Sequence, residues 1–190
     1  MLLEAERAAI ARLWRRKLDQ DGRGLPRSER HRNLEPSSAE FLCSLAAGVK
    51  ARRMVEIGGS SGISTIALAA AARQVGGRLT SIEVEPSRQS ESRRTLQELG
   101  LEKFIDYVRD DAAAALPSLT EVDLALIDCE KEDYVRFFDM LRVTPGGIVV
   151  ADNILSHALK DYVTHVRNRP GVESITLGIG KGLELTRFVG

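Results

Sequence analysis

The feature that most constrains this fold is a regular alternation of short apolar runs with longer stretches of helical periodicity, which starts near residue 52. The stretches between the runs are roughly 8 to 15 residues long, enough for a helical crossover between parallel strands. Short apolar runs that are bounded by turns and separated by helices indicate an α/β fold with a parallel sheet covered on both faces. The five predicted strands are Met54–Ile57, Leu79–Ile82, Phe104–Val108, Leu124–Ile127 and Gly147–Ala151.

The C-terminal part of the chain follows a different pattern. A helix is predicted over residues 156–168, and two further strand-like runs follow it, Val172–Leu177 and Leu183–Phe188. A glycine-rich stretch, residues 178–182, separates these two runs, which is typical of an antiparallel hairpin. The sequence therefore predicts a mostly parallel seven-stranded sheet that ends in an antiparallel hairpin, with helices on both faces.

Residues 1–36 are predicted to form an N-terminal helix and a basic linker, and residues 37–190 the main domain. Apolar side chains recur with helical spacing over residues 2–19. Ser37 or Ser38 can cap a second helix that runs to about Val49, with Glu40 placed for a capping box. The basic residues of the N-terminal part form either a solvated face or an electropositive rim; they are Arg15, Arg16, Lys17, Arg23, Arg27, Arg30 and Arg32.

Composition limits the classes of protein that this chain can belong to. A length of 190 residues with 43% hydrophobic residues fits one domain with a core of ordinary size. Because basic and acidic residues are equal at 27 each, no overall field favours nucleic acid or an anionic membrane. No signal peptide, long apolar span or paired cysteine framework is apparent, so the sequence predicts a cytoplasmic protein.

The segment that follows the first predicted strand, Glu56-Ile57-Gly58-Gly59-Ser60-Ser61-Gly62, has the character of a ligand-binding turn. Glycines there permit positive φ and let a ligand approach the backbone. Ser60 or Ser61 can cap the next helix, whose N-terminus favours an anionic group. The second strand ends at Glu83, about 20 residues after the turn, where an acidic side chain suits ribose hydroxyls. Together these features predict an adenosine ligand with a negatively charged end.

Two other interpretations of the turn are possible. A dinucleotide fingerprint requires glycines at 58, 60 and 63, but the chain has Ser60 and Ile63, which argues against NAD or FAD. The letters also match a hydrolase nucleophile elbow centred on Ser60, with Asp128 or Asp152 and then His157 in the order of a Ser-Asp-His triad. That elbow normally follows several strands rather than the first, and it gives Glu83 no role.

Acidic residues also follow two later strands. Asp128 comes after the fourth predicted strand, and Asp152 with Asn153 after the fifth, so their side chains are expected at the same sheet edge as Gly58. Carboxylate and amide oxygens are hard ligands that suit Mg²⁺, Mn²⁺ or Ca²⁺. The two cysteines, in contrast, have no zinc-site spacing. The same residue types are common helix caps, which leaves a purely structural role open.

Several motifs occur in an order and spacing that resemble one family, the small cation-dependent O-methyltransferases, which include catechol and caffeoyl-coenzyme A O-methyltransferases and many bacterial relatives. The resemblance runs from about Leu34 to Phe188. The motifs that carry it are Val55-Glu56-Ile57-Gly58 with Gly62-Ile63-Ser64-Thr65, Ser81-Ile82-Glu83-Val84-Glu85-Pro86, Asp111-Ala112 before Leu116-Pro117, Ile127-Asp128-Cys129-Glu130-Lys131-Glu132-Asp133-Tyr134, Pro145-Gly146-Gly147, Ala151-Asp152-Asn153 and Gly180-Lys181-Gly182-Leu183.

The resemblance implies a Rossmann-like class I methyltransferase fold that binds S-adenosylmethionine and methylates a hydroxyl of a small, catechol-like acceptor. It also implies a homodimer and a divalent cation, with Mg²⁺ the first choice, held by Asp128, Asp152 and Asn153. Lys131 and Asp128 would be the catalytic residues, with Lys131 as the base. In the cofactor site, Glu83 would hold the ribose, Gly58 and Ser64 the methionine end, and Asp111 and Ala112 the adenine. The full cofactor set is Glu56, Gly58, Gly59, Ser60, Gly62, Ser64, Glu83, Val84, Asp111, Ala112 and Asp128.

The chain departs from the family pattern in several places. Gly59 replaces the usual threonine, Ile63 a common aromatic residue and Ala39 a usual glycine. The segment after Asn153 is short and lacks the Trp-Gly insertion that shapes the acceptor pocket in larger relatives. His157 lies in this segment, either as a residue that lines the pocket or, as the favoured alternative, without a role in it. The N-terminal helix is expected either to fold over the acceptor site or to pack on a second subunit. A regulator or inactive paralogue that binds S-adenosylmethionine on this fold is the main alternative.

Overall fold

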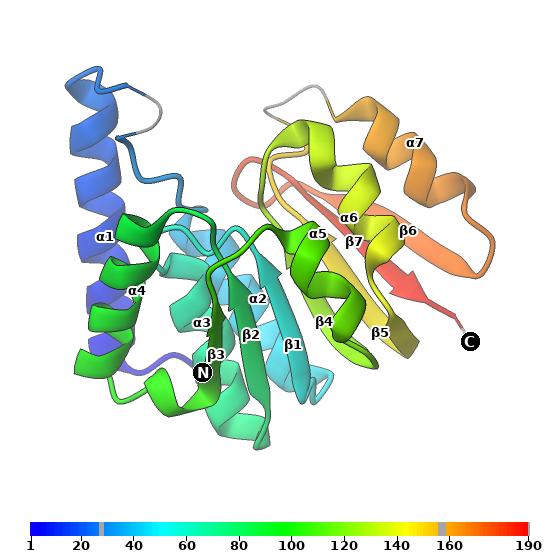
Figure 1. Ribbon diagram of the computed structural model, residues 1–190, viewed down its shortest axis with the longest axis horizontal. Coiled ribbons are helices and arrows are strands. Elements are labelled where there is room, and N and C mark those ends of the chain that lie inside the picture. The colour runs from blue at the N-terminus through cyan, green and yellow to red at the C-terminus, as the bar shows by residue number, and fades with distance from the viewer. Residues whose placement is uncertain (27–28, 156–158, 190) are drawn as a thin grey trace.

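Strands form one sheet in the computed structural model, which describes residues 1–26, 29–155 and 159–189 (Figure 1). The sheet order is β3-β2-β1-β4-β5-β7-β6. All pairs from β3 to β5 are parallel, while β7 is antiparallel to both β5 and β6. The predicted mostly parallel seven-stranded sheet with a C-terminal hairpin is therefore confirmed. The strands are β1 (Arg53–Ile57), β2 (Arg78–Ile82), β3 (Ile105–Val108), β4 (Val122–Ile127), β5 (Val143–Ala151), β6 (Val172–Leu177) and β7 (Leu183–Phe188).

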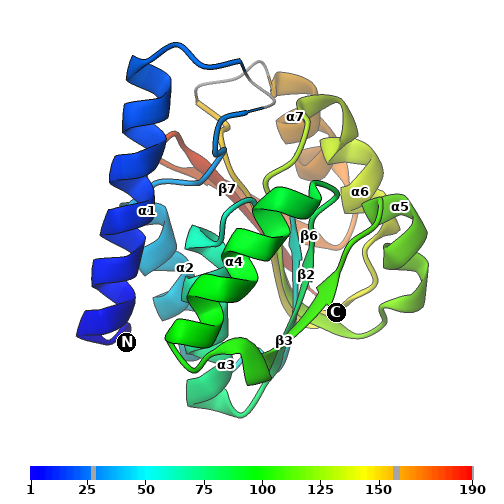
Figure 2. The ribbon, with the colours of Figure 1, turned by 60° about the vertical axis from the view of Figure 1, so that its left-hand side comes forward.

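Helices cover both faces of this sheet, as the sequence predicts (Figures 1 and 2). Along β4, Leu124 and Leu126 pack into one apolar layer and Ala125 and Ile127 into the other, because successive strand side chains point to opposite faces. The first layer contains side chains of α1 (Glu4–Gly22), α2 (Pro36–Gly48), α3 (Ile63–Val75) and α4 (Pro86–Glu98), and the second those of α5 (Ala112–Ala115), α6 (Tyr134–Met140) and α7 (Lys160–Asn168).

The N-terminal helix α1 covers most of its apolar stripe within its own chain, although Leu18 is 48% exposed. Ala9, Ile10 and Leu13 belong to the first apolar layer. On its outer side, α1 lies beside α4, where Arg12 pairs with Glu98 across 3.4 Å (Figure 2). Within the described part of the chain, no helix is long and apolar enough to cross a membrane.

Two predicted helix caps are wrong. Helix α2 takes Glu35 as its N-cap and Pro36 as its first residue, because the fixed φ of proline and its missing N–H suit that position. Ser38 is buried instead of capping. Helix α3 begins after Gly62, which has φ 109° and leaves neither Ser60 nor Ser61 as the cap. Both serines serve other contacts, described below.

The parallel register brings the ends of four strands to one edge of the sheet. Ile57 of β1 is level with Ile82 of β2 and Ile127 of β4, and Ile127 is level with Ala151 of β5. The residues that follow these positions therefore emerge side by side, at the carboxyl edge where open α/β sheets bind ligands.

Candidate functional site

The glycine turn after β1 lies directly against the end of β4. Gly58 has φ 93°, and a Cβ atom on it would overlap the backbone carbonyl oxygen of Asp128. The backbone N–H of Asp128 donates to the Ile57 carbonyl oxygen over 3.0 Å, which fixes this close approach. Only glycine fits here, so this residue sets how near the turn lies to Asp128.

Glu56 supports the turn from below. Its carboxylate is fully buried and accepts hydrogen bonds from the hydroxyls of Ser81 (2.6 Å) and Thr65 (2.8 Å). Burial raises the pKa of Glu56, although the Ser64, Ser81 and Thr65 hydroxyls partly offset this rise. A Cβ atom on Gly59 would lie 2.8 Å from the Glu56 carboxylate, so the turn packs closely against this side chain at Gly59.

Glu83 connects the turn to the end of β2. Its carboxylate accepts the backbone N–H of Ser60 over 2.8 Å and that of Glu85 over 2.9 Å. The residue is 7% exposed and borders a cavity above the glycine turn. A carboxylate has about four lone-pair positions, so two backbone donors leave room for ribose hydroxyls.

This first cavity has a volume of about 230 Å³. Seven residues predicted to bind the cofactor line it, namely Gly58, Ser60, Glu83, Val84, Asp111, Ala112 and Asp128. The other four predicted cofactor residues, Glu56, Gly59, Gly62 and Ser64, lie outside its lining. Asp111 also caps α5 by accepting the Ala113 backbone N–H over 2.7 Å.

The predicted metal residues come together at the ends of β4 and β5. The Asn153 side-chain amide donates to the Asp128 carboxylate over 2.8 Å, and Asn153 has φ 65°. Asp152 is 2% exposed, and its Oδ1 atom has no hydrogen-bond partner in the described structure. Burial and the nearby Asp152 raise the pKa of Asp128 well above its ordinary value, and burial raises that of Asp152 to about 6.

A second cavity, of about 380 Å³, adjoins this carboxylate pair. Asp128 lines both cavities, and the predicted base Lys131 lines the second. Lys131 is 53% exposed on its side chain and lies 4.0 Å from Glu132, so it is less enclosed than a base beside a buried metal. The other lining residues are Lys17, Asp21, Arg30, His31, Arg32, Asn33, Cys129, Glu130, Glu132, Tyr134, Asn153, Leu159 and Lys181.

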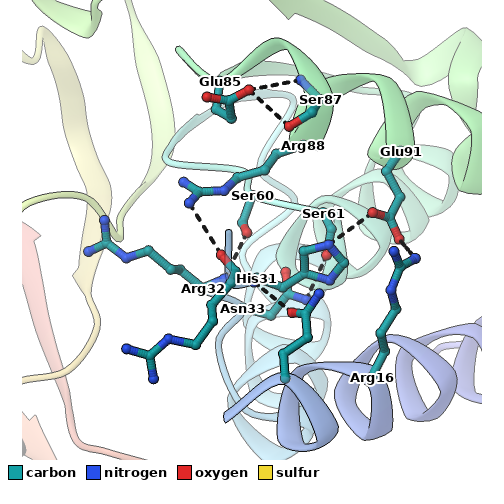
Figure 3. A network of polar contacts seen from close by, with 12 residues as sticks. Arg16, His31, Arg32, Asn33, Ser60, Ser61, Glu85, Ser87, Arg88 and Glu91 are labelled. Carbon is teal, nitrogen blue, oxygen red and sulfur yellow. Dashed lines mark hydrogen bonds and ion pairs between the residues drawn. The ribbon is translucent and has the colours of Figure 1, made fainter. Parts of the chain in front are cut away.

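The linker before α2 is tethered to the glycine turn (Figure 3). The Arg32 backbone N–H donates to the Ser60 hydroxyl over 3.1 Å, and the Asn33 amide donates to the Ser61 hydroxyl over 2.8 Å. These contacts explain why neither serine caps α3. The first contact also engages the Ser60 hydroxyl, which the hydrolase interpretation requires as its nucleophile. His157, the histidine of that interpretation, lies outside the described residues.

A second part of the same network joins the linker to α1 and α4 (Figure 3). His31 lies 3.0 Å from Glu91 of α4, and Arg16 of α1 pairs with the same carboxylate over 2.6 Å. The Arg88 guanidinium donates to the Arg30 carbonyl oxygen over 3.2 Å. The linker is therefore part of the wall that both cavities share.

Sequence reasoning missed two cations of the site. Arg32 lines both cavities and pairs with Glu130, and Lys181 reaches the second cavity from the turn between β6 and β7. The motif around Lys181 was visible in the sequence, but nothing local indicated which way it faces. The basic cluster that includes Arg32 gave the only signal for an electropositive rim.

The fold and these two cavities define an α/β protein with one cavity above the glycine turn, at the carboxyl edge of its sheet, and a second, polar cavity beside it. The chain belongs to the methyltransferase domain family, whose model matches residues 55–154. This result confirms the predicted resemblance.

Curated relatives have the activities that the motifs suggest. The chain is 34% identical over 126 residues to a catechol O-methyltransferase of Mycobacterium tuberculosis, over 64% of this chain and 57% of the relative. It is 31% identical over 130 residues to a catechol O-methyltransferase of Niastella koreensis, over 65% of this chain and 58% of the relative. The chain thus spans somewhat less than three fifths of the length of each.

Solved structures share the fold along nearly the whole chain. A cofactor-bound protein from MTB, Rv0187, matches with a TM-score of 0.78 and 26% identity, over 95% of this chain and 89% of the other. An SAH-bound methyltransferase of Podospora anserina, PaMTH1, matches with a TM-score of 0.83 and 18% identity, over 100% of this chain and 89% of the other. The predicted class I methyltransferase fold is therefore confirmed.

Proposed function

We propose that this protein is an S-adenosylmethionine-dependent O-methyltransferase that methylates a hydroxyl of a small, catechol-like acceptor with the help of a divalent cation. The observation that carries the proposal is that Asp128 lines both cavities. A transfer reaction requires donor and acceptor to meet at one point, in line and shielded from water. The shared wall at Asp128 provides such a point.

S-adenosylmethionine supplies the methyl group, and the first cavity is its proposed site. Glu83 accepts the ribose hydroxyls, while Asp111 and Ala112 border the adenine. Gly58 leaves the backbone open to the methionine end. Glu56 acts indirectly, since it is buried under the turn and holds its shape.

The residues at the ends of β4 and β5 fit a divalent cation. Asp152 raises the pKa of Asp128 and itself has an unpartnered buried oxygen, so the two carboxylates form an electronegative site whose charge a cation would compensate. The donor set of Asp128, Asp152 and Asn153 is oxygen-rich and suits Mg²⁺, with Mn²⁺ or Ca²⁺ as alternatives. When bound, the cation would supply Lewis acidity and a template for adjacent acceptor oxygens. The amide of Asn153 would then turn its oxygen, rather than its nitrogen, toward this site.

The second cavity is the proposed acceptor site. Lys131 at its rim is the proposed base, which would take the proton of the acceptor hydroxyl when its own amine is neutral, and the linker residues 30–33 line the same cavity as Asp128. In this arrangement the N-terminal part of the chain, residues 1–36, encloses the acceptor instead of serving only as a spacer. We further propose that the protein is a cytoplasmic homodimer, which sedimentation of the purified protein would test for assembly.

The test is methyl transfer from labelled S-adenosylmethionine to a panel of vicinal diols, before and after metal removal by chelation. We expect turnover to stop after chelation and to return with Mg²⁺. Asp152→Ala should remove metal-dependent turnover and keep cofactor binding, because Asp152 lines neither cavity. Full turnover in metal-free buffer would overturn the role of the cation.

A second candidate function is regulation by cofactor binding without transfer, on the same fold. The retained polar cavity beside Asp128 favours the enzyme, because a pure cofactor sensor needs no acceptor site. Calorimetric binding of S-adenosylmethionine combined with no transfer across the whole diol panel would favour the regulator instead.

A further inference from the structure

The turn between β6 and β7 is fixed against the segment that follows Asn153. The backbone N–H of Leu155 donates to the Lys181 carbonyl oxygen over 2.8 Å, and that of Ile154 donates to the Gly182 carbonyl oxygen over 3.0 Å. Gly182 has φ 90°, and a Cβ atom there would overlap the Leu155 side chain. The backbone of Lys181 is therefore held in place beside the proposed metal site.

The other side of this turn is equally close to α2. A Cβ atom on Gly180 would lie 2.5 Å from the Ser38 hydroxyl and 2.7 Å from the Glu35 carboxylate. The turn therefore contacts the start of α2 on one side and the segment after Asn153 on the other. Because both sides are in contact, the base of the Lys181 side chain has little freedom to move away from the site.

From this position Lys181 lines the acceptor cavity together with Asp128 and Asn153. The positive charge of Lys181 lowers the pKa of both Asp128 and Asp152, against the larger effect of burial, so the ammonium group lies within electrostatic range of both carboxylates. No ion pair within the described residues uses Lys181.

The other nearby cations are already engaged. Arg32 also lowers the pKa of Asp128, but its guanidinium is paired with Glu130. Lys131 lies 4.0 Å from Glu132 and is not among the groups that shift Asp128 or Asp152. Glu35 adds a further negative charge near Asp152. Arg32 has the larger effect on Asp128, but of these three cations Lys181 alone lowers the pKa of both carboxylates.

A buried carboxylate such as Asp152, close to the half-buried Asp128, is costly unless a positive charge compensates it. We propose that the ammonium group of Lys181 is the built-in counter-charge of the Asp128–Asp152 pair in the metal-free protein, and that it competes with a divalent cation for this site. The inference rests on the proposed metal site and adds a residue that tunes its affinity. A lysine suits this role because its long, flexible stem lets the charge withdraw when another cation arrives.

This competition has a measurable size. Coupling between two neighbouring charged or binding groups typically changes the affinity of one of them by about 5- to 150-fold. We therefore expect Lys181→Met to bind Mn²⁺ about tenfold tighter than the wild-type protein. Lys181→Arg keeps the charge and should stay within about twofold of wild type.

The experiment is a titration of the SAH-loaded full-length protein with Mn²⁺, followed by electron paramagnetic resonance of the free ion. Lys131→Met is the matched control, because it removes the same charge from the same cavity but not from the carboxylate pair. Its Mn²⁺ affinity should change by less than about threefold. A thermal melt of the metal-free proteins gives a second readout: Lys181→Met should melt below wild type and regain the difference when Mg²⁺ is added. Lys181→Gln repeats both measurements if the methionine variant folds poorly.

The outcomes separate this inference from the proposed function. Equal Mn²⁺ affinity in wild type and Lys181→Met would overturn the competition while leaving the metal site intact. Weaker binding by Lys181→Met, or an equal gain in Lys131→Met, would overturn it as well. Absence of Mn²⁺ binding in every variant would overturn both the competition and the metal part of the proposed function. Binding by Lys181→Met but not by wild type would support the competition and would contradict the metal part of the proposed function.

Discussion

Removal of the Glu83 carboxylate is the perturbation for which the structure gives the clearest expectation. In the protein alone, this carboxylate accepts backbone N–H groups of Ser60 at 2.8 Å and Glu85 at 2.9 Å. In the proposed complex it also accepts the ribose hydroxyls. Glu83→Gln keeps the size of the side chain but replaces one acceptor oxygen with a donor, so one backbone N–H is left facing an N–H group. Hydrogen bonds to charged groups contribute about 1.5 to 3 kcal/mol each.

Loss of one such bond to the ribose corresponds to a fall of roughly 10- to 150-fold in cofactor affinity. Calorimetric titration with SAH at a temperature well below the unfolding midpoint measures this fall without interference from stability. Glu85→Gln is the matched control, since Glu85 caps α4 through Ser87 and is not part of the cavity lining. Its SAH affinity should stay within about twofold of wild type. Wild-type affinity in Glu83→Gln would refute the assignment of the ribose to this side chain.

Three further predictions concern the support of the site. Gly58→Ala should destabilise the protein by about 2 kcal/mol or more in urea unfolding, because φ is positive and the new methyl group would overlap the Asp128 carbonyl oxygen; an unchanged midpoint would contradict this geometry. Asn33→Ala should cost about 1 to 2 kcal/mol in the same assay, since it removes the buried hydrogen bond to the Ser61 hydroxyl, and a neutral result would show that the linker is not tethered there. Glu91 has a pKa lowered from 4.5 in the folded protein: burial opposes this shift, but the neighbouring histidine and arginines outweigh it. The ionised Glu91 carboxylate therefore contributes to the free energy of unfolding above about pH 4.5, and this contribution is lost as the pH falls through the folded-state pKa. Between about pH 5 and pH 3, Glu91→Gln should lose less of its free energy of unfolding than wild type. Equal losses in the two proteins would contradict the direction of the pKa shift.

Much of the fold followed from the local pattern of the sequence. The runs Val172–Leu177 and Leu183–Phe188 match β6 and β7 residue for residue, because the alternation and the glycine-rich turn between them are local signals. The first strands were predicted within one or two residues for the same reason. Strand β5 was predicted to begin at Gly147 but begins at Val143, since Pro145 and two glycines conceal the extended segment before it.

The site was predictable where residues follow strand ends and less so elsewhere. Gly58, Glu83 and Asp128 converge because the parallel register fixes their height at the sheet edge. Glu56 belongs to the same motif, yet its side chain points to the hydroxyls of Thr65 and Ser81 and not into the cavity, because strand side chains alternate. Arg32 and Lys181 enter from a linker and from a hairpin turn. Their placement depends on long-range packing, for which no local spacing gives a signal.

The central claim is that one cavity holds the cofactor, the other holds the acceptor, and both meet at Asp128. A crystal structure of the protein with SAH, Mg²⁺ and a vicinal diol tests it most directly. We predict adenosine beside Glu83 and Asp111, and the diol in the second cavity with its oxygens turned toward Asp128. SAH bound away from Glu83, or a diol bound far from Asp128, would contradict the account.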